Sequence, residues 1–321
     1  MLIYEKIVDG IFLIYSDSKF WYKCRGILIR NENIGNILID CNCYYPKEIQ
    51  TLVRNPIEAY FVSHVHLDHT FNLHYYEELV PNIKIHCPIP EIDYLKDFNK
   101  FIKDNGTLDY GIGEEFKMFA FKELKFKEVK SAIGFNPGAE FEFKSANLKL
   151  KTIPIPGHSP AQTAFSIEDT TGKRRKILFV ADIGLGQMGA YYGFSYGNLN
   201  DVRESVKRIE DIYLNDDYIV TSSHGPIFFK KIPALFDNIL ITMEEKERDI
   251  LNMLDSNNPK GLKDLILKGL FFDETVTKLL SVDRKFSVQF FEHNMIMKHI
   301  KELLEQEKII DVGNNQWILN K

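Results

Sequence analysis

The sequence predicts an α/β protein with a large first domain and a small, mostly helical second domain. Over about the first 230 residues, short apolar runs rich in β-branched residues alternate with polar connections, which is the pattern of strands. After His224-Gly225-Pro226 the apolar residues recur at helical spacing instead. A chain of 321 residues is long enough for two units, so we place domains at residues 1–231 and 232–321.

Nine segments of the first domain have clear strand or helix patterns. Strands are predicted at residues 7–15, 26–30, 36–41, 59–63, 148–155, 176–181 and 217–222, where β-branched and aromatic residues cluster. A short helix is predicted at residues 45–54, with Pro46 in its first turn. A longer helix at residues 200–213 is capped by Asn200 or Asp201 and has one apolar face.

Residues 88–145 differ from the rest of the first domain. They are rich in Phe, Tyr, Lys and Glu, with turn signals at Asn105-Gly106 and Asn136-Pro137-Gly138. We expect an inserted helical and hairpin region here. It either forms one wall of a cleft or elaborates the surface, and the sequence leaves both alternatives open.

The second domain resembles a winged helix in its order of elements. Further helices are predicted at residues 261–269, 273–280 and 287–306. A β-hairpin turning at Gly313-Asn314-Asn315 ends the chain. From residue 232 onward there are 12 Lys and Arg against 15 Asp and Glu, a balance of −3, which does not favour binding to phosphates. We expect this domain to pack on the first, cover a cleft or form a homodimer contact.

Composition and charge favour a cytoplasmic protein. The chain is 45% hydrophobic and 26% charged, as in globular proteins. Its four cysteines (Cys24, Cys41, Cys43 and Cys87) lack zinc-ribbon spacing, which favours reduced thiols. The N-terminus lacks a signal-peptide pattern, and no run of 18 apolar residues could span a membrane. A net charge of −5 gives no general attraction to nucleic acid or anionic lipid.

One short motif carries the chemistry. Residues 59–69 read AYFVSHVHLDH, so an apolar strand leads directly into four titratable side chains. In an extended segment residues two apart point the same way, so His64, His66 and Asp68 can converge. His69 follows at a turn. Imidazole and carboxylate are ligands for zinc, and also for iron or manganese. Burying four such groups together without a cation would be costly.

More polar side chains follow other predicted strands. Asp40, His158, Asp182 and His224 each stand at the C-terminal end of one of them. Ligand sites in layered α/β proteins gather at such strand ends, where loops converge on one crevice. These four residues and the histidine motif therefore indicate one common location.

These residues resemble the metallo-β-lactamase-fold superfamily, whose five successive motifs they match in order over roughly residues 5–230. The resemblance implies a four-layer αβ/βα sandwich with two divalent metal ions at one edge, zinc being favoured over iron or manganese. It implies one ion on His64, His66 and His158. It implies a second ion on Asp68, His69 and His224, bridged to the first by Asp182. Asp40 would orient a ligand.

One departure from the family pattern follows the motif. Many relatives have small glycines soon after the last histidine, whereas this chain has Thr70-Phe71-Asn72. The Phe71 ring either narrows the pocket or packs in the core. The departure bears on the choice of substrate and not on metal binding.

Such a site activates water. Two ions about 3.5–4 Å apart can share a hydroxide and polarise a scissile bond. Coordination lowers the pKa of bound water to about 7, so a metal-bound hydroxide is available to attack at neutral pH. Asp68 can help to move the proton. Tyr191 or Tyr192, in a glycine-flanked loop, could donate to the oxyanion, unless both rings pack under that loop.

The leading functional hypothesis is hydrolysis of a small acyl compound, namely a thioester, ester or lactone. One alternative is a nuclease of the same fold that cuts RNA or another phosphodiester, against which the acidic second domain argues. Another is a mononuclear iron enzyme that oxidises sulfur and keeps the same histidines. Flavin-linked diiron relatives usually have an acid at the position of His66, so that branch is disfavoured.

Overall fold

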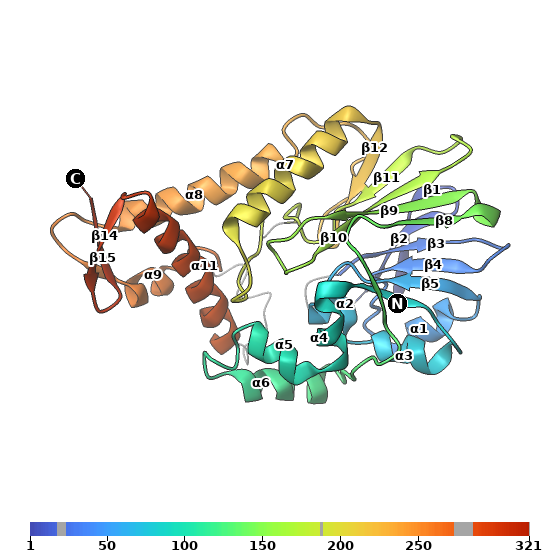
Figure 1. The fold of residues 1–321 in the computed structure, drawn as a ribbon, viewed down its shortest axis with the longest axis horizontal. Coiled ribbons are helices and arrows are strands. Elements are labelled where there is room, and N and C mark those ends of the chain that lie inside the picture. The colour runs from blue at the N-terminus through green and yellow to red at the C-terminus, as the bar shows by residue number, and fades with distance from the viewer. Residues whose placement is uncertain (18–23, 187–188, 273–284, 321) are drawn as a thin grey trace.

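Two β-sheets lie face to face in the computed structural model, which describes residues 1–17, 24–186, 189–272 and 285–320 (Figure 1). The first sheet runs in the order β1 (Leu2–Val8), β2 (Ile11–Ser16), β3 (Gly26–Ile29), β4 (Asn36–Ile39), β5 (Ile57–Phe61), β6 (Ile85–Pro88) and β7 (Ile133–Phe135). The second runs in the order β12 (Tyr218–Thr221), β11 (Lys176–Phe179), β10 (Thr163–Asp169), β9 (Leu148–Pro154) and β8 (Glu140–Phe143).

Helices cover the outer faces of both sheets and fill the connections. They are α1 (Pro46–Leu52), α2 (Leu67–Thr70), α3 (Leu73–Leu79), α4 (Ile92–Lys96), α5 (Phe98–Asp104), α6 (Gly113–Met118), α7 (Leu199–Asn215), α8 (Asp237–Met253), α9 (Leu262–Lys268) and α11 (Lys285–Glu305). Short helical turns occur at η1 (Ile89–Glu91), η2 (Phe119–Glu123) and η3 (Lys144–Ala146).

The alternation of side chains along the strands produces four layers. In β4, Ile37 and Ile39 face the second sheet, whereas Leu38 faces the outer helices. The core between the sheets therefore joins strands of both, and a second core joins the first sheet to α1 and α3. A third core packs the other face of the second sheet against α7 and α8. The predicted αβ/βα layering is seen in this arrangement.

Three details of the sequence prediction for this region are wrong. Residues 7–15 form parts of two antiparallel strands, because Gly10 at φ 80 turns the chain between them. Strands β6 and β10 were not predicted at all. The helix predicted from residue 200 begins one residue earlier, at Leu199, and its cap is Asn198 instead of Asn200 or Asp201, since the Asn198 side chain accepts the Asp201 N–H.

The region at residues 88–145 is helical as expected, but its two described strands, β7 and β8, do not form a hairpin with each other. Strand β7 pairs in parallel with β6 in the first sheet, whereas β8 pairs antiparallel with β9 in the second. The turn at Asn136-Pro137-Gly138 therefore carries the chain from one sheet to the other. Two short strands around a turn signal look like a hairpin in sequence, and only their partners distinguish the two cases.

The C-terminal region has helices α8, α9 and α11 and a small sheet in the order β13 (Lys260–Gly261), β15 (Gln316–Leu319) and β14 (Ile309–Gly313). The predicted hairpin is present, with Asn314 and Asn315 both at positive φ as its two-residue turn requires. The predicted helix at residues 273–280 lies outside the described residues. Whether this region is a winged helix stays a prediction.

Helix α8 takes part in two cores. Its first half places Ile239 and Met243 in the core of the second sheet, beside α7. Its second half places Ile250 in a separate C-terminal core around Trp317. The predicted boundary at residues 231 and 232 therefore stays a prediction, since a helix beyond it packs into the first region.

None of the helices in the described ranges is long and apolar enough to cross a membrane. All four cysteines lie within the described residues and are free thiols.

We expect Gly157→Ala to destabilise the fold strongly. Gly157 has φ +120, and a Cβ there would lie 2.4 Å from the backbone nitrogen of Val202 in α7. The positive φ alone costs about 1–3 kcal/mol, and the contact with backbone adds to it. Chemical denaturation should show a larger loss than for Gly138→Ala, the control, where φ is +94 but the space is open. Equal losses for the two variants would contradict this account.

Candidate metal centre

The histidine motif lies where β5 ends and a helix begins. His64 and His66 lie in the connection after β5, while Asp68 and His69 lie in the short helix α2. The expectation that Asp68 would share one side of an extended segment with His64 and His66 is therefore wrong. After His66 the chain forms a helical turn instead of continuing as an extended segment. This turn directs Asp68 and His69 to a second group of side chains.

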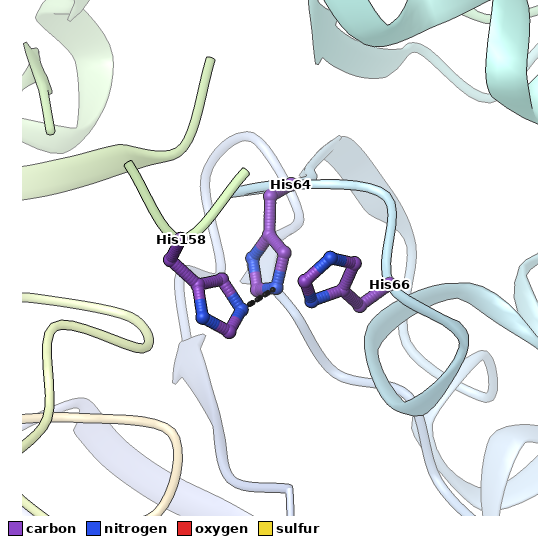
Figure 2. Close-up of side chains that lie close together, drawn as sticks. All are labelled: His64, His66 and His158. Carbon is purple, nitrogen blue, oxygen red and sulfur yellow. Dashed lines mark hydrogen bonds between the residues drawn. The ribbon is translucent and has the colours of Figure 1, made fainter. Parts of the chain in front are cut away.

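His64, His66 and His158 form the first group (Figure 2). The Nε2 atoms of His64 and His158 are 3.1 Å apart, and one ligand atom from each residue lies within 4.8 Å of the others. All three side chains are buried. Burial, followed by nearby histidines, lowers the pKa of His64 and His66 well below the usual value. They are therefore neutral at physiological pH and have a lone pair for a cation.

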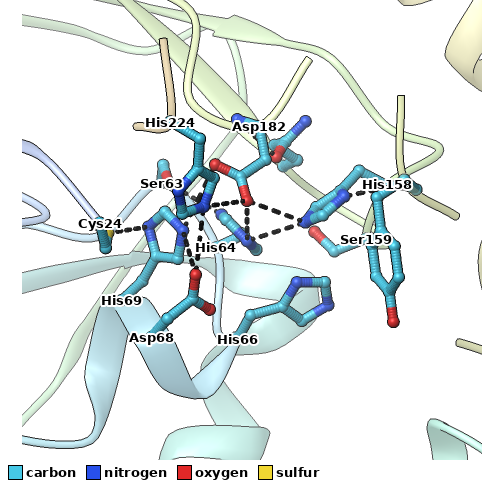
Figure 3. A network of polar contacts seen from close by, with 12 residues as sticks. Cys24, Ser63, His64, His66, Asp68, His69, His158, Ser159, Asp182 and His224 are labelled. Atoms are coloured by element: carbon cyan, nitrogen blue, oxygen red, sulfur yellow. Dashed lines mark hydrogen bonds and ion pairs between the residues drawn. The ribbon is translucent and has the colours of Figure 1, made fainter. Parts of the chain in front are cut away.

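Asp68, His69, Asp182 and His224 form the second group (Figure 3). His224 Nε2 lies 3.1 Å from Asp182 Oδ2 and 3.2 Å from Asp68 Oδ2. His69 Nε2 lies 3.4 Å from Asp182 Oδ1 and 3.6 Å from Asp68 Oδ2. The structure thus brings together all seven residues predicted as ligands.

Asp182 stands between the two groups. Its Oδ2 atom is 3.5 Å from His158 Nε2 and 4.0 Å from His64 Nε2, as well as near His224. Its backbone N–H donates to Gln162 Oε1 at 3.2 Å. This is the position that a bridging carboxylate would occupy.

The charges of the second group balance one another. Burial raises the pKa of Asp68, but His69 and His224 outweigh it and lower this pKa to about 2. Burial lowers the pKa of His224, but Asp182 and Asp68 outweigh it and raise this pKa to about 9. The group therefore contains ionised carboxylates that attract positive charge.

The donor atoms fit divalent cations. His69 Nε2 and Asp182 Oδ1 are buried and, although they lie 3.4 Å apart, neither makes a hydrogen bond. Such orphaned buried atoms are costly, and a cation bound to their lone pairs would remove the cost. Three imidazoles on one side and two carboxylates with two imidazoles on the other are ligand sets typical of zinc, with iron or manganese also compatible.

Asp40 holds His69 in place, as expected. Its Oδ2 atom lies 2.9 Å from His69 Nδ1, and its Oδ1 atom accepts the Ser63 N–H at 2.8 Å. Since a carboxylate accepts, His69 Nδ1 carries a proton, so Nε2 is the nitrogen that would offer a lone pair to a cation. Asp40 therefore orients the ligand atom of His69 and links it to the motif loop at Ser63.

The two tyrosines proposed as oxyanion donors do not both lie at the centre. The Tyr192 hydroxyl is buried and lies 2.7 Å from Nε2 of His299 in α11, so its predicted catalytic role is wrong. Tyr191 packs its ring near His158 and Phe291, and its backbone carbonyl accepts from His158 Nδ1 at 2.8 Å. Its hydroxyl role stays a prediction. Phe71 is buried in the core and packs on Tyr44.

Glu91 is a buried residue that the sequence did not single out. Its Oε2 atom accepts the N–H of Val65, between His64 and His66, at 2.9 Å. Its Oε1 atom accepts the Ser159 hydroxyl and the Ala161 N–H, both at 2.6 Å. Glu91 therefore ties the first motif loop to the His158 loop. No sequence signal marked it within residues 88–145, although those residues do contribute to the centre.

Tyr196 is the second residue that sequence reasoning missed. Its hydroxyl oxygen lies 2.8 Å from His66 Nε2, and its ring stacks on His66 with centroids 6.1 Å apart. It belongs to the same glycine-flanked loop as Tyr191 and Tyr192. The loop was the right place to look for a tyrosine, but the sequence could not show which ring faces the centre.

We expect Glu91→Gln to weaken metal binding at the first group. An amide would place a donor against N–H or O–H donors, which costs about 1–3 kcal/mol and loosens both ligand loops. Zinc affinity, measured by competition with a chelator, should fall together with thermal stability. The matched control is Glu292→Gln, because buried Glu292 accepts the N–H groups of Phe271 and Phe272 in the C-terminal region. Glu292→Gln should lose stability alone, and an equal loss of zinc affinity in both variants would contradict the role of Glu91.

Similar folds are found among solved structures at low sequence identity. A beta-lactamase domain protein from Burkholderia ambifaria is 13% identical with a TM-score of 0.72, over 99% of this chain and 93% of that one. A metallo-beta-lactamase family protein from Thermus thermophilus is 16% identical with a TM-score of 0.72, over 98% and 100%. An archaeal superfamily protein from Sulfolobus tokodaii is 15% identical with a TM-score of 0.55, over 88% and 98%. These likenesses show the fold alone.

The sequence comparisons identify the family. No curated protein matches the chain. The family model of the metallo-beta-lactamase superfamily matches residues 24–224, which include all seven clustered ligand candidates. Because this match covers more than half of the sequence, the chain belongs to the metallo-beta-lactamase superfamily.

Proposed function

We propose that this protein is a dinuclear metal-dependent hydrolase that acts on a small acyl compound, namely a thioester, ester or lactone. The observation that carries the proposal is the place of Asp182, whose two carboxylate oxygens lie within 4 Å of histidines from both groups. One group alone has enough ligands for a single ion, so two groups that share a carboxylate favour two ions. Membership of a superfamily of metal-dependent hydrolases supports the general reaction.

Each residue has a defined task in this proposal. His64, His66 and His158 would hold one ion, and Asp68, His69 and His224 the other, with Asp182 shared between them. Bound ions supply water activated for attack at neutral pH and polarise the scissile bond. Asp68 has the more exposed carboxylate, with 20% of its side chain accessible against 10% for Asp182. It is therefore the group that would take up a proton, on the oxygen that does not face His224.

The surroundings favour an acyl substrate over a nucleic acid. The chain has a net charge of −5, and its C-terminal region is acidic by three charges. A polyanion would be repelled at long range by this balance. Aromatic rings pack around His66 in the first group, among them Tyr191, Phe194 and Tyr196, and such a lining suits a small organic molecule.

We expect about two divalent ions per chain in the purified protein, measured by elemental analysis. Asp182→Ala should lower the content of both, because it contacts both groups, while His66→Ala should lower the first alone. Turnover of an acyl substrate should fall by about 100-fold or more in either variant, since the ions supply several kcal/mol of stabilisation. His86→Ala, a half-buried histidine in β6 that stacks on Phe61, is the matched control and should keep its ions.

A panel of thioesters, lactones, phosphodiesters and RNA decides the substrate class. Turnover of phosphodiesters without acyl hydrolysis would replace this proposal with a nuclease. One iron per chain, with oxidation of a thiol or persulfide, would replace it with a mononuclear iron enzyme. Activity unchanged in His66→Ala would remove the mechanism itself.

A further inference from the structure

We propose that Arg25 is a positioning residue that holds the loop of residues 222–225 in place, and with it His224, one of the four ligand candidates of the second group. The inference rests on the metal-binding part of the proposed function and not on the choice of substrate. Arg25 directly precedes β3 in the first sheet, whereas His224 follows β12 in the second. The contact therefore joins the two sheets beside the ligand candidates.

Arg25 binds the loop on both sides of the histidine. Its backbone N–H donates to the Ser223 carbonyl at 2.9 Å, and its guanidinium Nη1 donates to the Gly225 carbonyl. These two acceptors are the residues directly before and after His224, so the two bonds together fix the backbone that carries its imidazole. Any residue could make the first bond, but the second needs a long side chain with N–H donors at its end.

The guanidinium is itself held in place. Its central carbon lies 5.1 Å from the centroid of the Tyr15 ring, which is a cation–π contact. Its Nε atom is buried and makes no hydrogen bond, which costs free energy that the other contacts of the group have to offset. The loop is therefore attached to a packed group and not to a side chain that moves freely in solvent.

The second sheet holds the other side of the same loop. The Ser223 N–H donates to the Ala181 carbonyl at 3.1 Å, just after β11. The packing there is tight, since a Cβ added at Gly186 would lie 3.1 Å from the Cβ of His224. The loop is therefore confined between the two sheets, and loss of the arginine side chain would take away part of its support from the first sheet.

The position of His224 affects the second group more than the first. Its Nε2 atom lies 3.1 Å from Asp182 Oδ2 and 3.2 Å from Asp68 Oδ2 (Figure 3). A ligand that is misplaced by about 1 Å is enough to loosen a metal site. The hydrogen bonds of Arg25 within the described ranges go to the His224 loop and not to the loops of the first group. Loss of Arg25 should therefore weaken binding of the second ion selectively.

The test compares Arg25→Met with Arg30→Met. The two arginines flank the same strand, β3, and each guanidinium lies over an aromatic ring, Tyr15 for Arg25 and Phe12, at 4.6 Å, for Arg30. In stepwise zinc competition with a chelator, Arg25→Met should lower the affinity for the second ion about 10-fold or more, as when other partners that orient metal ligands are removed. The affinity for the first ion should stay unchanged, and Arg30→Met should keep both affinities.

A conservative variant and a ligand variant complete the zinc series. Arg25→Lys keeps a long side chain with an N–H donor, so it should restore much of the affinity for the second ion. His224→Ala identifies which of the two zinc affinities belongs to the second group. A purely structural role of Arg25 would instead lower both zinc affinities together with the thermal stability.

Hydrogen exchange on the metal-free protein provides a readout that needs no zinc. The Ser223 amide should exchange faster in Arg25→Met than in Arg30→Met, because its loop has lost a support, while core amides of β3 and β12 keep their rates. The Arg25 amide of the unaltered protein should exchange as slowly as the amides of β3, because it donates to the Ser223 carbonyl. This second measurement holds even if Arg25→Met fails to fold.

The outcomes separate the inference from the proposed function. Equal affinities for the second ion in Arg25→Met and Arg30→Met, or rapid exchange of the Arg25 amide in the unaltered protein, would overturn the inference. Binding of only one ion by the unaltered protein would contradict the dinuclear function. In that case faster exchange of the Ser223 amide in Arg25→Met would still support the role of Arg25, and unchanged exchange would overturn it.

Discussion

The centre depends on gathering seven polar side chains in a space that excludes most water. Burying carboxylates and imidazoles is costly unless each proton and lone pair has a partner. Here Asp68 and Asp182 face His69 and His224, so opposite charges offset much of that cost before any ion binds. The atoms that still make no hydrogen bond, His69 Nε2 and Asp182 Oδ1, are ones that a cation would bind. Ligands arranged in advance lose little entropy on binding, which favours tight coordination.

The backbone at the strand ends is strained by this arrangement. Asp40 and Ala181 adopt positive φ angles of 49° and 43° at the ends of β4 and β11, although neither is a glycine. Such conformations cost about 1–3 kcal/mol each and persist only where the surroundings enforce them. Packing between the two sheets provides that enforcement, since Ile39 and Phe179, next to these turns, are fully buried in the shared core. Strain at the turns directs Asp40 and Asp182 inward.

The ligand candidates were predictable because each follows a strand with a strong local pattern. His64, His158 and Asp182 could be placed from strand ends and motif order without knowing how the sheets pack. Glu91 and Tyr196 could not be placed, because their contacts cross between connections whose paths depend on tertiary packing. A glycine-flanked loop has no periodicity, so nothing in the sequence showed that Tyr196 faces inward while Tyr192 faces α11.

The strands β7 and β8 show the same limit for the fold. Each has only three or four residues, and they do not pair with each other: β7 pairs with β6, far back in the chain, and β8 pairs with the next strand, β9. The local sequence pattern around Asn136-Pro137-Gly138 therefore predicted a hairpin at a turn where the chain crosses from one sheet to the other. Conversely, the terminal hairpin was predictable, because Asn314 and Asn315 specify a turn type that joins adjacent strands.

Helix α8 contributes side chains to two hydrophobic cores, and this affects how the protein unfolds. Ile239 and Met243 are buried in the core of the second sheet, and Ile250 is buried in the C-terminal core. All three of these residues lie on one continuous helix. Unwinding of α8 at either end would expose apolar side chains of the core that this end of the helix packs against. Heat or denaturant should therefore unfold both regions in a single cooperative transition. Cleaving the chain before α8 would give two fragments with exposed apolar surface that aggregate, and not two domains that fold independently.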